Sequence, residues 1–243
     1  MIIILRLKEL IYINTNYSEK KILSYGIEFK DFVCSLADPI NNILLIAHHY
    51  FGEDFHSRTG FYYVRKEHLN RLLNADIYNF GDFCWVDFED AASLDSLKPN
   101  EVAELLYFGH TGQLLGSSYF GGLKNRFAYY SHDDGWHNEL YCQDINEFLN
   151  VITNIILKKS ITSKRCKVCP IQDDIAKTLL KISENGLLVD FNCINRYNGL
   201  EIPIYVIGKL YNMDDLYHNL ERYKGKAKQN LLLVYKNKRW ILK

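Results

Sequence analysis

The segment from Arg126 to Cys142, RFAYYSHDDGWHNELYC, constrains the fold more than any other part of the sequence. RFAYYSH and WHNELYC each alternate and are rich in aromatic residues, and the DDG between them is a strong turn signal. We therefore expect a β-hairpin whose turn is Asp133, Asp134 and Gly135, with Gly135 at positive φ. The two-residue period separates two faces, one with Trp136, Asn138, Leu140 and Cys142 and the other with His137, Glu139 and Tyr141.

A helix is predicted directly after this hairpin, in DINEFLNVITNIILKK. Asp144 and Glu147 have the spacing of a capping box, with Asp144 as the cap. Apolar residues follow at helical intervals, and Lys158 and Lys159 lie at the negative end of the helix dipole. We expect this helix to cover the apolar face of the hairpin.

Shorter patterns predict other elements of the first part. NNILLIAHHYF, residues 41–51, indicates a strand, and GFYYVRKEHLNRLLN, residues 60–74, indicates a strand that passes into a helix. LKPNEVAELLYFG indicates a helix that begins near Pro99 and stops at Gly109. The glycine-rich segment 109–122 is expected to be a loop, and long loops in compact domains often carry function.

The polar run KKSITSKRCKVCP, residues 158–170, interrupts the periodicity and reverses the charge balance. We therefore divide the chain into an acidic α+β domain, 1–160, and a basic α+β domain, 161–243. The second is predicted as α-β-β-α-β-β, ends in a hairpin that turns at Asn237 and Lys238, and is small enough to need docking on the first. The expected fold class is α+β, with a mixed N-terminal domain of β-hairpins and packed helices before this C-terminal unit.

Charge is divided unevenly along a chain whose net charge is zero. Residues 1–160 hold 14 basic and 21 acidic residues, whereas 161–243 hold 15 and 8. Between Asp76 and Glu104 there are eight acidic residues and one base, Lys98, and Phe80, Phe83, Trp85 and Phe88 lie among them.

Acidic charge around aromatic anchors can steer and hold a basic protein partner. We therefore predict a binding surface made of Trp85, Asp87, Glu89, Asp90 and Asp95. The alternative interpretation is that the rings belong to the core and the acids are solvated outside it.

The hairpin also supports a catalytic hypothesis. His132, Asp134 and His137, with His110, offer the imidazole and carboxylate groups that a metal-dependent hydrolase uses. Proximity in sequence is not convergence in space, and the DDG composition is common in turns that have no other role. In the structural alternative, His132 and His137 simply face each other across the two strands.

Two features of the C-terminal part are ambiguous. The C-x-x-C spacing of Cys166 and Cys169 indicates half of a zinc site or a redox pair, but the sequence has no second C-x-x-C, so the alternative is two ordinary reduced thiols. The basic segment ERYKGKAKQN, residues 221–230, suggests nucleic-acid binding through Lys224 and Lys226, and a solvated helix end is the alternative.

The sequence contains no G-x-G-x-x-G, P-loop, G-x-S-x-G or H-E-x-x-H motif, which disfavours the well-marked nucleotide-cofactor enzymes, and we expect no cofactor. The apolar start, Met1–Leu5, is too short for a signal-peptide core or a membrane span and is expected to be a strand. We therefore expect a cytoplasmic protein with no membrane partner.

The order of hairpin, capped helix INEFLNVI and acidic surface is similar, over roughly forty residues, to small bacterial immunity proteins that neutralise partner toxins. That likeness implies a non-enzymatic inhibitor. Our leading hypothesis is thus a cytoplasmic binding protein that engages a basic protein partner. A metal-dependent hydrolase and a nucleic-acid-binding protein are the alternatives.

Overall fold

The computed structural model describes residues 9–47, 54–75, 81–132, 137–161, 168–197, 199–210 and 212–243. Within these ranges the chain forms twelve strands and seven α-helices. The strands are β1 (Leu10–Asn16), β2 (Lys21–Tyr25), β3 (Asn42–Ala47), β4 (Asp54–His56), β5 (Phe61–Val64), β6 (Phe83–Phe88), β7 (Phe127–His132), β8 (His137–Cys142), β9 (Leu187–Asp190), β10 (Leu200–Val206), β11 (Gln229–Lys236) and β12 (Arg239–Leu242). The helices are α2 (Phe29–Ser35), α3 (Leu69–Leu73), α4 (Ala91–Ser96), α5 (Pro99–Thr111), α6 (Phe148–Ser160), α7 (Asp173–Ser183) and α8 (Met213–Gly225).

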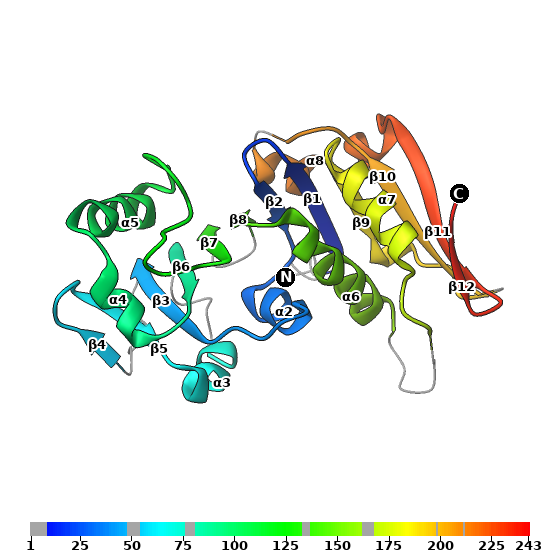
Figure 1. Ribbon diagram of the computed structural model, residues 1–243. Helices are drawn as coiled ribbons and strands as arrows, with labels where there is room; N and C mark the ends of the chain where they lie inside the picture. The colour runs from blue at the N-terminus through cyan, green and yellow to red at the C-terminus, as the bar shows by residue number, and fades with distance from the viewer. Residues whose placement is uncertain are drawn as a thin grey trace.

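The twelve strands belong to one sheet, in the order β12-β11-β10-β9-β1-β2-β8-β7-β6-β3-β5-β4. All of the strand pairs are antiparallel. β1 pairs with β9, so the sheet runs without a break from the first part of the chain into the last (Figure 1). The protein thus combines helices with one large antiparallel sheet, as the expected α+β class requires.

Helices α2, α6 and α7 cover one face of this sheet, and α6 and α7 lie side by side (Figure 1). The core beneath them extends from Leu45 on β3 to Trp240 on β12. Alternate residues of the strands enter it, as the two-residue period of a strand requires. α6 contributes an apolar side to this core: Phe148, Val151, Ile152, Ile155 and Ile156.

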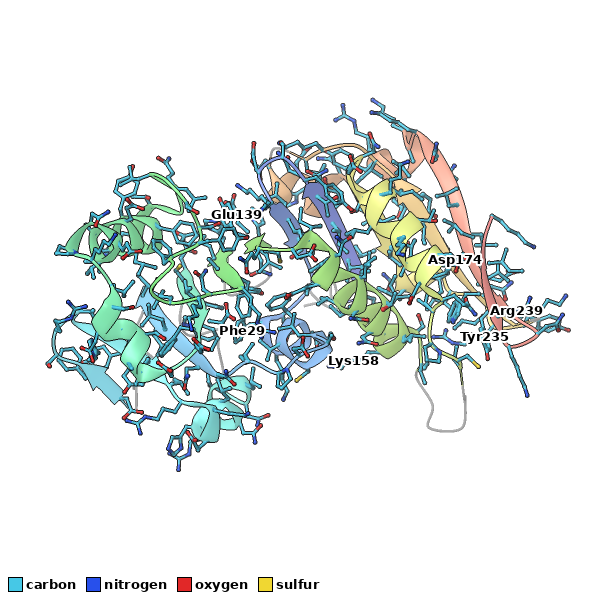
Figure 2. The ribbon with its side chains drawn as sticks, viewed as in Figure 1. Phe29, Glu139, Lys158, Asp174, Tyr235 and Arg239 are labelled. Atoms are coloured by element: carbon cyan, nitrogen blue, oxygen red, sulfur yellow. The ribbon has the colours of Figure 1, made fainter. Side chains whose placement is uncertain are left out.

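The opposite face carries two separate apolar clusters. α4 and α5 cover the first, where Leu105 and Phe108 belong to the same cluster as Leu44 and Val86 of the sheet. α8 covers the second, where Leu216 is grouped with Leu10, Tyr12 and Leu188. Between the two clusters lie Lys21 of β2 and Glu139 of β8, whose charged groups are 2.7 Å apart (Figure 2 labels Glu139).

The elements with the strongest local patterns are where the sequence places them. The hairpin is β7 and β8, with Asn138, Leu140 and Cys142 on the side covered by α6. Asp144 caps the 3₁₀ turn Ile145–Glu147 before α6 by accepting a hydrogen bond from the Asn146 amide, and the predicted capping box with Glu147 is not formed. The turn residues 133–136 and the predicted strand 1–5 lie outside the described residues.

Other expectations are incomplete or wrong. The predicted stop at Gly109 is wrong, because α5 continues to Thr111 and ends at Gly112, which has a φ of +66° and donates its amide to the Phe108 carbonyl. Residues 10–35, for which no element was predicted, form β1, β2 and α2.

The C-terminal elements follow the expected α-β-β-α-β-β order, and Asn237 and Lys238 form the last turn at positive φ. This unit is joined to β1 by side chains as well as by strand pairing. The Tyr12 hydroxyl donates to the Gly208 carbonyl, and the Asn14 amide donates to the carbonyls of Ser183 and Glu184. The division into domains at residue 160 stays a prediction.

Candidate recognition surface

The aromatic residues of the acidic stretch are core residues. Phe83, Trp85 and Phe88 are buried on β6, which lies between β3 and β7 near the centre of one half of the sheet. Since helices cover both faces there, both sides of β6 are enclosed: Trp85 packs edge-on against Phe29, and Phe88 against Tyr63. The core interpretation is therefore confirmed for these rings, and Trp85 is not displayed to a partner. Phe80 lies outside the described residues.

Asp87 is buried and has a structural role. Its carboxylate accepts hydrogen bonds from the amides of Arg126 and Phe127 and from Nε of Arg126. The other guanidinium nitrogens of Arg126 donate to the carbonyls of Asp38 and Pro39. Asp87 therefore fixes the entry to β7 and is not part of an exposed binding surface.

The environment of Asp87 makes stability depend on pH in a defined direction. Burial raises the pKa of its carboxyl from 3.8 to about 6, against the opposing effect of the Phe127 and Arg126 hydrogen bonds. Because the folded state holds this proton more tightly than the unfolded chain, the stability it contributes is full below pH 4 and is lost as pH rises through 6, by ~3 kcal/mol. We expect Asp87→Asn to destabilise the protein less at pH 7 than at pH 4, as measured by urea unfolding. A larger loss at pH 7 would show that the charged carboxylate stabilises the fold.

The other three predicted binding residues are exposed. Glu89 is paired with Lys124, and Asp95 with Arg58 and His56. Asp90 caps α4 by accepting hydrogen bonds from Ser93, which hold the pKa of Asp90 below its usual range. Their role in binding stays a prediction. These three acidic residues lie in or next to α4, so they place negative charge around the layer that α4 and α5 form on the sheet.

α5 carries a second, mostly apolar stripe that was not predicted from the sequence. Val102, Leu105, Phe108 and Gly109 face the sheet, whereas Ala103, Leu106, Tyr107 and His110 are exposed at the spacing i, i+3, i+4, i+7. We call these four exposed residues the α5 outer stripe. The adjacent pair Leu106-Tyr107 could have revealed this stripe in the sequence. A helix covered on one side needs only one apolar stripe, and these two residues lie outside it.

The outer stripe is apolar where most surface helices are polar. Leu106 and Tyr107 are 39% and 37% exposed, and Leu115, in the loop after the helix, is 63% exposed. Glu104 lies next to this loop, since a Cβ on Gly116 would be 3.3 Å from its carboxylate. Glu101 is half-exposed and caps the helix by accepting from the Lys98 amide. Exposed apolar side chains are thus bordered by carboxylates.

The two hairpin histidines face each other, as expected. His132 and His137 are directly opposite, with ring centroids 5.3 Å apart, and Nδ1 of His132 is 3.5 Å from Asp82. Among the described residues, no group of three or more histidine, cysteine, aspartate or glutamate side chains is placed to hold a metal ion. Asp134 lies outside those residues, so the hydrolase hypothesis stays a prediction. His110 belongs to the α5 outer stripe.

The remaining sequence candidates lie in the C-terminal part. Cys169 is a half-buried free thiol, and Cys166 lies outside the described residues, so the zinc hypothesis is untested. Lys224, expected to contact nucleic acid, is largely buried in an ion pair with Asp190. Lys226 is exposed. None of the helices in the described ranges is long and apolar enough to cross a bilayer.

Comparison of the chain with protein-family models, with curated proteins and with solved structures finds no match.

Proposed function

We propose that this protein is a non-enzymatic binding protein of the immunity or inhibitor kind, and that it holds a basic protein partner on the α5 outer stripe. The observation that carries the proposal is the exposure of Leu106, Tyr107 and Leu115 within the acidic half of the chain. Interfaces take most of their affinity from a few apolar and aromatic anchors, and tyrosine is among the residues most often found there.

Charge around the stripe supports the choice of a basic partner. The α4–α5 layer presents five carboxylates and one lysine: Glu89, Asp90, Asp95, Glu101 and Glu104 against Lys98. Two of the acids are neutralised by Lys124 and Arg58, which leaves an excess of negative charge. Such an excess speeds encounter with a positively charged protein and disfavours acidic ones.

The proposal also replaces the anchors expected from sequence. Trp85 is enclosed in the core, so it cannot supply contact area, whereas Leu106 and Tyr107 supply it from the outer side of a rigid helix. The anchors lie on a regular element packed on the sheet, and such a site loses little conformational freedom on binding.

The test is capture of partners from a lysate of the source organism on the immobilised protein. We expect Leu106→Ser with Tyr107→Ser to reduce capture of a basic protein at least tenfold, since two interface anchors are removed. The control is Tyr197→Ser with Ile241→Ser, which removes a tyrosine and an aliphatic side chain that are both more exposed than Tyr107 and Leu106, from the other end of the sheet. Equal loss in both variants, or capture unaffected by the stripe substitutions, would contradict the proposal.

A further inference from the structure

The end of the sheet farthest from α5 carries a cluster of cations beside an exposed ring. From Lys226 to Lys243 the chain has six basic residues and no acidic one. Three exposed basic residues lie around the turn between β11 and β12, namely Lys236, Lys238 and Arg239, whereas Arg196, in the loop before β10, donates to the Ser160 carbonyl at the end of α6. Tyr197, in the same loop, is 91% exposed, the largest exposure among the large apolar and aromatic side chains described.

Strand pairing brings these segments together. Lys236 and Arg239 are direct partners across the last hairpin, and Leu200 is the partner of Tyr235. The loop before Leu200 is in close contact with β11, because a Cβ on Gly199 would be 2.8 Å from the Tyr235 carbonyl. Figure 2 shows Arg239 at the outer edge of the sheet, near Tyr235.

Lys236 and Arg239 point away from the main core. Their neighbours Tyr235 and Trp240 pack in the core beneath α7, and successive side chains of a strand alternate between faces. Ile241 shares the outer face with them and is 45% exposed. Glu201, the partner of Val234, adds a carboxylate on that face and accepts a hydrogen bond from Asn195.

We propose that this end of β10, β11 and β12 binds single-stranded nucleic acid, with Lys236, Lys238 and Arg239 on the phosphates and Tyr197 stacked on a base. The cations would contact the phosphates of the nucleic acid, and a ring as exposed as that of Tyr197 can stack on any unpaired base. The site differs from the basic segment singled out in the sequence, because Lys224 is occupied by Asp190 and Lys226 lies at the opposite end of β11.

Fluorescence anisotropy with a labelled oligothymidylate tests the proposal on the full chain. We expect binding whose affinity falls with salt at a log–log slope of about −2, from three phosphate contacts at roughly 0.7 each. Lys236→Glu with Arg239→Glu should weaken binding at least tenfold. Lys226→Glu with Lys228→Glu, an equal change of charge at the other end of β11, should weaken it less than threefold.

Two substitutions isolate the stacking contact. We expect Tyr197→Ala to weaken binding about tenfold. Tyr197→Trp should retain binding and add a tryptophan signal that is quenched by the oligonucleotide, unlike the signal of the wild-type protein.

Three results would overturn the proposal. Absence of oligothymidylate binding at low salt is the first, and the same loss of affinity in both charge-reversal variants is the second. The third is an affinity for poly-glutamate equal to that for oligothymidylate, which would indicate an acidic protein partner. None of these results depends on whether the α5 outer stripe captures a basic protein, so the two proposals can fail separately.

Discussion

Gly186→Ala is expected to lower the free energy of unfolding by about 4 kcal/mol or more. Gly186 follows α7 at a φ of +75°, and an added Cβ would be 1.9 Å from the Gly208 carbonyl oxygen and 3.0 Å from the Tyr12 hydroxyl. The two loops must separate, although they are joined by hydrogen bonds from Ile207 to Gly186 and from Gly208 to Asn185. The left-handed backbone strain of alanine costs about 1 kcal/mol, and each of the two lost hydrogen bonds costs about 1 kcal/mol. A buried Tyr12 hydroxyl left without a partner costs about 1–3 kcal/mol more.

Two glycines serve as matched controls for this substitution in urea unfolding. Gly208 has a φ of +92° and open space where a Cβ would be, so Gly208→Ala should cost only the backbone strain, about 1–2 kcal/mol. Gly225 has neither positive φ nor a neighbour within 4 Å, so Gly225→Ala should change stability by less than about 1 kcal/mol. A Gly186→Ala protein as stable as the Gly208→Ala protein would contradict the close approach of these loops.

Lys224→Met is expected to cost about 3–5 kcal/mol, because it leaves the fully buried carboxylate of Asp190 without its cation. The pair joins the end of α8 to the end of β9, so its loss should loosen the only helix described on that part of the sheet face. Lys224 also contacts Glu221, but that carboxylate is exposed, and Glu221→Gln should cost less than about 1 kcal/mol.

A double-mutant cycle measures the same interaction directly. Combining Lys224→Met with Asp190→Asn removes both charges, so the double variant should be more stable than Lys224→Met alone, with a coupling energy of about 2 kcal/mol or more. Additive single effects would mean that the two groups do not stabilise each other.

Local sequence patterns predicted the elements that local physics determines. The hairpin of β7 and β8, the helix α6 and the last turn depend on neighbouring residues, and each was predicted correctly, although α6 begins without the predicted side-chain cap. β1 and β2 lacked such a signal, because their turn contains Lys20 at a φ of +52° where a glycine would have marked it. The pairing of β1 with β9 joins residues far apart in the chain, which no periodicity indicates.

The candidate site was predicted only in part, for a related reason. Sequence showed that rings and acids alternate around β6, but not that this strand lies inside the sheet with helices on both faces. Burial removed Trp85 and Asp87 from the predicted surface and left Glu89, Asp90 and Asp95. The anchors of the proposed surface lie one helix later, on α5, where the extra apolar pair Leu106-Tyr107 is visible in the sequence.

Hydrogen–deuterium exchange of the complex with the captured basic partner tests the binding proposal most directly. The proposal predicts slower exchange at the exposed end of α5 and in the following loop, residues 103–118, and no change in β10, β11 and β12. Protection of residues 196–206 or 229–242 with residues 103–118 unchanged would contradict it, because the partner would then be held at the opposite end of the sheet.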